Sequence, residues 1–95
     1  MELANKICLV TGGTRGIGAA IALDLAEAGA SVALVARRND EIAQSVRAGV
    51  ERLGQRCLLM AADVGRPEAA AACVQRTIAE LGGLDVLVHS AKAVR

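Results

Sequence analysis

Four glycines lie close together near the start of the chain, in the run Thr11-Gly12-Gly13-Thr14-Arg15-Gly16-Ile17-Gly18. The run lies between a short apolar segment and a segment of helical periodicity, which is the setting of a phosphate-binding loop. Gly12 permits a sharp turn, Gly16 lets the backbone approach a pyrophosphate, and Gly18 lets a helix pack tightly on a sheet. A helix N-terminus adds free N–H groups and partial positive charge. We favour dinucleotide binding over the alternative, a glycine-rich turn without a ligand.

Two basic residues, Arg37 and Arg38, follow the second apolar run. In dinucleotide-binding folds this position meets the adenosine ribose, and an acidic residue there would bind the 2′-hydroxyl of NAD. Arginine instead suits the 2′-phosphate of NADP, because its planar fork matches phosphate oxygens. Arg15, inside the glycine run, can approach the same phosphate. We expect NADP(H) to be favoured over NAD(H), with Arg37 as the main contact and Arg38 as a peripheral one. The alternative is a solvated turn.

Short apolar runs alternate with amphipathic segments along the chain. Strands are expected at Ile7 to Val10, Ser31 to Ala36, Cys57 to Ala62 and Leu84 to Val88. Helices are expected from Ile17 to Ala28, after a cap at Asn39 and Asp40, and from Pro67 to Leu81, with glycines as stops. Apolar periodicity predicts the face of each helix that packs on the sheet. For the first helix this face is Ile17, Ile21 and Leu25, and for the second it is Ile42, Val46, Val50 and Leu53. For the third helix it is Ala70, Cys73, Val74, Thr77, Ile78 and Leu81.

The alternation predicts an α/β fold of one domain, residues 1–95, with element order β-α-β-α-β-α-β. Parallel pairing and right-handed crossovers give a Rossmann-like sheet, with strand order 3-2-1-4 in a three-layer αβα arrangement. The fold is expected to be truncated after the fourth strand.

Composition argues against several classes of function. The net charge is +1 and aromatic residues are absent, so neither a nucleic acid nor a membrane partner is expected. Cys8, Cys57 and Cys73 are odd in number and widely spaced, which argues against a disulfide framework or a metal cluster. Cys8 and Cys57 lie in apolar runs and are expected to fill the core. Reduced thiols, and a start without signal-peptide features, favour a cytoplasmic location.

The glycine run resembles that of the short-chain dehydrogenase/reductase family, whose motif T-G-x-x-x-G-x-G is matched at each fixed position. The similarity continues at Asp63-Val64 and at 84–88, and covers essentially the whole chain. In the family, the aspartate at the position of Asp63 hydrogen-bonds the adenine amino group. We predict no catalytic and no metal-binding residue in this chain. The predicted cofactor-binding residues are Gly12, Thr14, Arg15, Gly16, Ile17, Gly18, Arg37, Arg38, Asp63, Val64 and Ala91.

The chain departs from the family after the fourth strand, where Asn-Asn-Ala-Gly is usual. Here the sequence is His89-Ser90-Ala91-Lys92, and only Ala91 agrees. His89 and Ser90 could still make polar contacts at the strand end. Lys92 either hinders the productive cofactor pose or adds a phosphate contact. A structural role is favoured for His89 over that of a catalytic base.

The resemblance also implies that the catalytic groups are missing. In the family a Tyr-x-x-x-Lys helix and a preceding serine follow the fourth strand, and the tyrosine transfers a proton. This chain ends at Arg95 and contains no tyrosine. We therefore expect an NADP(H)-binding part of an oxidoreductase that is inactive as an isolated chain, with its substrate undetermined.

Two alternatives remain open. In the order 3-2-1-4 the fourth strand is an edge, and an edge invites pairing with another chain. The chain would then self-associate, or pair with a full-length relative as a non-enzymatic interaction module. An active enzyme that uses His89 and Lys92 is the least favoured, because nothing in the sequence orients such a pair.

Overall fold

The computed structural model describes residues 2–12 and 16–89. Strands and helices alternate in the predicted order. They are β1 (Ile7–Thr11), α1 (Gly16–Glu27), β2 (Ser31–Ala36), α2 (Glu41–Arg52), β3 (Cys57–Ala61), α3 (Pro67–Leu81) and β4 (Val86–His89). The main difference is at the fourth strand, which begins at Val86 rather than Leu84 and continues to His89.

The strands form a parallel sheet in the order β3-β2-β1-β4, which confirms the predicted order. In this register Leu9 of β1 lies beside Ala33 of β2 and Leu87 of β4. The chain proceeds from β1 towards β3 on one side and places β4 on the other. The carboxyl ends of β1 and β4 therefore flank the point where the strand order reverses, which is where open α/β sheets bind ligands.

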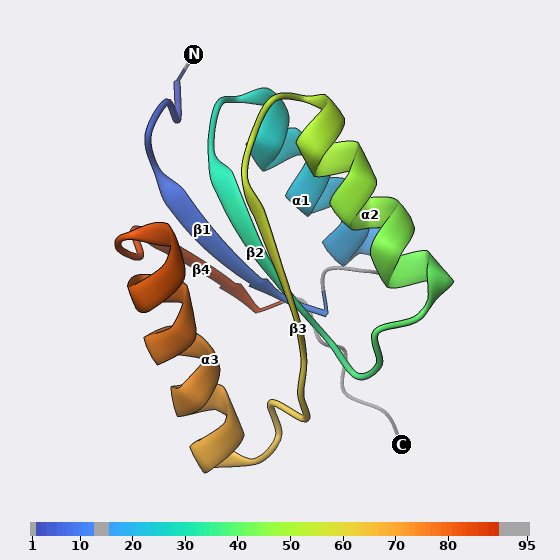
Figure 1. Cartoon of the computed structure of the whole chain (residues 1–95), viewed down its shortest axis with the longest axis vertical. Coiled ribbons are helices and arrows are strands. Elements are labelled where there is room, and N and C mark those ends of the chain that lie inside the picture. The colour runs from blue at the N-terminus through green and yellow to red at the C-terminus, as the bar shows by residue number, and fades with distance from the viewer. Residues whose placement is uncertain (1, 13–15, 90–95) are drawn as a thin grey trace.

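Helices cover both faces of the sheet, α1 and α2 on one face and α3 on the other, as Figure 1 shows. This is the predicted three-layer arrangement. Every residue of β1 and β2 is buried, as expected for strands that are covered on both sides. The core on the α3 face is built from Ile7, Leu9, Ala33, Val35, Met60, Cys73 and Leu81. The core on the opposite face is built from Val10, Ala22, Ala26, Val32, Leu34, Val46 and Val50.

The predicted inner face of α1 was only partly right, because Leu25 packs against the core and Ile21 is half-buried, but Ile17 is not part of that face. The buried residues of this helix are Gly18, Ala22 and Ala26, whereas Ile17 is 76% exposed. Small residues let the helix backbone lie close to the sheet, so close packing rather than side-chain size selected the buried face. Ile42, Leu53 and Ile78 of the other predicted faces are also exposed, at 44%, 40% and 49%. Their buried neighbours Val46, Val50, Cys73, Thr77 and Leu81 were predicted correctly.

Asp85 aligns β4 with β1 just before β4 begins. Its Oδ2 accepts a hydrogen bond from the Ile7 N–H at 2.9 Å, and its own N–H donates to the Ile7 carbonyl at 2.8 Å. The two bonds fix where β4 starts against β1. They thereby determine which residues reach the carboxyl edge of the sheet.

Candidate functional site

The carboxyl ends of the strands bring several predicted residues to one edge of the sheet. Gly12 follows β1, Arg37 and Arg38 follow β2, Asp63 lies just after β3, and His89 ends β4. Because all pairings are parallel, these positions share one edge, the lower end of the sheet in Figure 1. The residues come from segments far apart in the sequence, and the sheet alone assembles them.

Two glycines of the motif, Gly12 and Gly16, lie within the described residues. Gly12 and Gly16 have φ values of 72° and 51°, a left-handed conformation that glycine adopts without strain. The Gly12 N–H donates to the Val35 carbonyl at 2.9 Å, which holds the loop on β2. A Cβ on Gly16 would meet no atom within 4 Å, so it would project into the open space before the helix. A ligand can occupy this space when residue 16 is glycine, whereas a side chain at this position would fill part of it.

The N-terminus of α1 adds electrostatic attraction for an anion. The helix has twelve residues and its first turn contains no acidic residue, so the helix's own side chains do not oppose the partial positive charge there. Gly18 is buried against the sheet, as its predicted packing role requires. Ile17 is exposed in the same turn, where a ligand over the loop would cover it.

Arg37 and Asp63 lie next to each other at the carboxyl ends of β2 and β3. The Nη2 of Arg37 is 4.0 Å from the Oδ1 of Asp63, and their side chains are 84% and 53% exposed. The same Oδ1 accepts from the Gly65 N–H at 3.0 Å, which fixes the carboxylate in the turn after β3. The structure thus brings together the residue predicted to bind the 2′-phosphate and the one predicted to bind adenine.

Five other predicted cofactor-binding residues either make no contact that supports the prediction or lie outside the described residues. Arg38 is exposed beside Arg37. Val64 is half-buried and packs against the core on the α3 face, so its role beside an adenine ring stays a prediction. The predictions for Thr14, Arg15 and Ala91, like those for Ser90 and Lys92, lie outside the described residues.

A hydrogen bond that the sequence did not specify joins Thr11 to His89. The Thr11 Oγ1 and His89 Nδ1 are 2.7 Å apart, at the paired last residues of β1 and β4. Either tautomer of the imidazole satisfies the contact, since the hydroxyl both donates and accepts. The polar contact expected of His89 is therefore present, and its role in this structure is to join two strand ends. The sequence offered one signal for this contact, which is that both residues lie at the ends of strands.

The cysteines are free thiols in the packed parts of the fold. Cys8 and Cys73 are buried and Cys57 is half-buried. Burial raises the pKa of all three, that of Cys57 to about 12, with a smaller contribution from the Glu51 carboxylate. A thiol with a raised pKa is a poor nucleophile and a poor metal ligand at neutral pH. The core role predicted for Cys8 and Cys57 agrees with this burial.

Two further findings concern the described part of the chain. It contains no group of three or more His, Cys, Asp or Glu side chains arranged to hold a metal ion. None of its helices is both long enough and apolar enough to cross a membrane.

Comparison with known proteins identifies relatives over nearly the whole chain. The family model "short chain dehydrogenase" matches residues 6–94. General stress protein 39 of Bacillus subtilis is 43% identical over 90 residues, which are 95% of this chain and 32% of that protein. The chain thus spans about a third of the length of such curated relatives.

Solved structures share the fold at high similarity. A short chain dehydrogenase from Burkholderia cenocepacia, in complex with NADP, has a TM-score of 0.95 and 47% identity, with coverage of 100% of this chain and 39% of the other. An NAD+-bound xylitol dehydrogenase has a TM-score of 0.86 and 33% identity, with coverage of 92% and 33%.

Proposed function

This chain belongs to the short chain dehydrogenase family, and we propose that it binds a nicotinamide dinucleotide at the carboxyl edge of its sheet, NADP(H) in preference to NAD(H). One similar structure holds NADP and another holds NAD+, so both cofactors are candidates. The observation that carries the preference is the Arg37 guanidinium, 84% exposed directly after β2. A phosphate on the adenosine ribose favours a guanidinium at that position, whereas the 2′-hydroxyl of NAD favours a carboxylate.

The residues at this edge fit such a ligand. Gly16 leaves space for a pyrophosphate at the N-terminus of α1, and Asp63 offers an acceptor for the adenine amino group. The Asp63 carboxylate lies near Arg37, but it also accepts from Gly65. Arg37 has five N–H donors and can serve both a carboxylate and a phosphate. These side chains hold and orient the dinucleotide, which supplies the hydride chemistry when bound.

We infer that the chain contributes the nucleotide-binding part of an oxidoreductase. The chain spans about a third of the length of its relatives, so we propose no substrate for it. In this family a tyrosine transfers the catalytic proton, and these 95 residues contain no tyrosine. We therefore expect dinucleotide binding without turnover when this chain is assayed alone.

The cofactor proposal can be tested by isothermal titration calorimetry of the purified chain, with NADPH and with NADH in separate titrations. NADPH should bind more tightly, and Arg37→Ala should reduce NADPH affinity about 10- to 100-fold while affecting NADH little. Arg52→Ala is the matched control, because Arg52 is an exposed arginine at the C-terminal end of α2, whereas Arg37 lies before the N-terminal end of that helix. Equal affinity for both cofactors, or no effect of Arg37→Ala, would reject the preference. A folded chain that binds neither cofactor would reject the binding site.

We also propose that the isolated chain self-associates, or pairs with a longer relative, along β4. This strand pairs only with β1 among the described strands. Its four residues Val86–His89 contain no lysine, proline or acidic residue, the usual protection of a sheet edge. Leu87 on this strand is 58% exposed, which favours burial against another chain.

A cytoplasmic location is a further proposal. It is supported by the three cysteines, all of which are free thiols in the folded chain. Unpaired cysteines suit a reducing compartment. Cell fractionation with an antibody against the chain tests it, and recovery in a secreted fraction would contradict it.

A further inference from the structure

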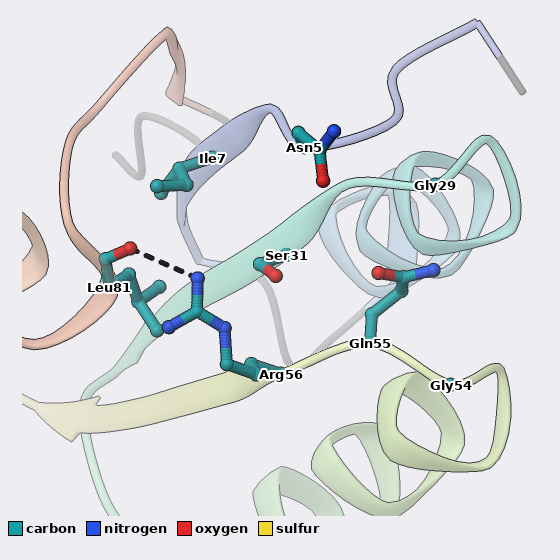
Figure 2. A pocket seen from close by; sticks show the side chains of 8 residues that line it. All are labelled: Asn5, Ile7, Gly29, Ser31, Gly54, Gln55, Arg56 and Leu81. Atoms are coloured by element: carbon teal, nitrogen blue, oxygen red, sulfur yellow. Dashed lines mark hydrogen bonds between the residues drawn. The ribbon is translucent and has the colours of Figure 1, made fainter.

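A hollow of about 390 Å³ lies at the amino ends of the strands, on the edge opposite the glycine loop. We call it the amino-edge hollow. Its polar side chains are those of Asn5, Ser31, Gln55 and Arg56, which come from the segments that lead into β1, β2 and β3. Figure 2 shows these side chains around one space. The volume is at the small end of the range for sites that bind small molecules, about 300–1,000 Å³.

Ser31 supplies a hydroxyl that the fold does not use. The residue is only 9% exposed, and its N–H donates to the Lys6 carbonyl at 2.9 Å. Its Oγ has no hydrogen-bond partner within residues 2–12 and 16–89, and in Figure 2 the side chain faces the hollow. Because no buried side-chain oxygen or nitrogen of the described residues lacks a hydrogen-bond partner, this unpaired hydroxyl is open to the hollow, where water or a ligand can bond with it.

Arg56 supplies a positive charge without a counterion. Its Nη2 donates to the Leu81 carbonyl at 3.0 Å, which holds the guanidinium at the hollow. No carboxylate of the described chain forms an ion pair with it, and none lines the hollow. A guanidinium has five N–H donors, so the contact with Leu81 leaves several of them for a planar oxyanion.

Several backbone carbonyls at the helix ends along this edge are already hydrogen-bonded. The carbonyls of Leu25 and Ala26, at the end of α1, accept from Ala30 and Gly29 at 3.0 Å each. The end of α2 closes in the same way through Gly54, and Arg56 occupies the last carbonyl of α3. The hollow therefore presents the side-chain donors of Asn5, Ser31, Gln55 and Arg56 beside carbonyls that are in part already hydrogen-bonded.

Asn5 and Gln55 extend the polar lining beyond Arg56. Asn5 has a left-handed backbone with φ 67°, which asparagine tolerates better than most residues. Figure 2 shows its amide oxygen directed toward the hollow and the Gln55 amide on the other side. These amides both donate and accept, so they suit the hydroxyl or carbonyl groups of an organic molecule as well as an anion.

We propose that the amino-edge hollow binds a small organic anion that carries a phosphate or a carboxylate group. The Arg56 guanidinium binds the charged group and the Ser31 hydroxyl donates to the same ligand. The site is separate from the dinucleotide edge, because the strands run between them. It does not depend on the proposed cofactor preference.

The test is a titration of the ¹⁵N-labelled chain with inorganic phosphate or with succinate, followed by NMR at constant ionic strength. Chloride at the same ionic strength is the control. Saturable shifts of the Gly29, Ser31, Gly54 and Gln55 amides are expected, and the more effective anion identifies the charged group. Arg56→Gln should weaken binding about tenfold or more, whereas Arg52→Gln should not.

Shifts confined to the glycine loop, or shifts that Arg56→Gln leaves unchanged, would overturn the proposal. Because the phosphate arm could also report on the glycine loop, the position of the shifting amides separates the two sites. Arg56→Gln loses the contact with Leu81, so its fold is checked by the dispersion of the NMR spectrum. If that variant is unfolded, Ser31→Ala decides the question: weaker binding supports the site, and unchanged binding rejects it.

Discussion

The guanidinium of Arg37 and the carboxylate of Asp63 lie 4.0 Å apart, at the ends of two neighbouring parallel strands. Both side chains are largely exposed, and exposed ion pairs contribute little to stability, about 0–1 kcal/mol. The fold therefore does not depend on this pair, and both side chains remain accessible from solvent.

Arg37→Ala is expected to leave the fold intact. The free energy of unfolding should change by less than about 1 kcal/mol, because the Arg37 side chain is 84% exposed and its ion pair is screened by solvent. Urea unfolding without nucleotide measures this. A much larger loss would mean that Arg37 is structural, and the reduced NADPH affinity of the variant would then say nothing about cofactor contact.

Gly16→Ala should weaken both the fold and dinucleotide binding. Its φ of 51° costs a residue with a Cβ about 1–2 kcal/mol, and the added methyl group enters the space before α1. Gly82→Ala is the matched control, since Gly82 has φ 96° and equally open surroundings at the end of α3. Both variants should lose stability in urea, but only Gly16→Ala should lose affinity for NADPH. Equal affinities of the two variants would contradict a ligand at the glycine loop.

Asp85→Ala should destabilise the pairing of β4 with β1. It removes the acceptor of the Ile7 N–H at 2.9 Å, at an expected cost of about 1 kcal/mol. Asp85→Asn keeps an oxygen at that place and should cost less. Chemical denaturation of both variants measures the difference, and equal losses would show that the side-chain hydrogen bond is unimportant.

Stability should decrease at alkaline pH because of the thiols. Burial raises the pKa of Cys57 from 9.0 to about 12, so the folded chain disfavours the thiolate. The contribution of Cys57 is fully present below pH 9 and is lost as the pH rises from 9 towards 12. Urea unfolding at pH 8, 9 and 10 should show a shallower decrease for Cys57→Ala than for the original chain. Parallel curves would contradict this role.

Leu87→Lys should reduce self-association along β4. The side chain is 58% exposed on an edge strand, and a lysine there would repel a second copy and remain solvated. Leu53→Lys, at a residue 40% exposed after α2, is the control for added charge. Sedimentation velocity over a range of concentrations measures the oligomeric state. A monomeric original chain would reject the proposed interface.

The sequence by itself determined the element order, the parallel sheet and the place of the glycine loop. Continuous apolar runs such as Ser31–Ala36 indicate strands buried on both faces, and glycines such as Gly29 mark helix ends through local backbone energetics. These features depend on residues near one another in the chain. The positions of Gly12, Arg37 and Asp63 at one edge of the sheet follow from the parallel direction of the strands they come after.

Only the tertiary structure decided which face of α1 is buried and which distant side chains meet. Ala22 and Ala26 are buried where Ile17 is not, because the distance between helix and sheet is set by packing across the whole layer. The Thr11–His89 contact and the amino-edge hollow likewise depend on strand register and on helix ends brought together from separate parts of the chain. Periodicity carries no information about such contacts, because it describes one element at a time.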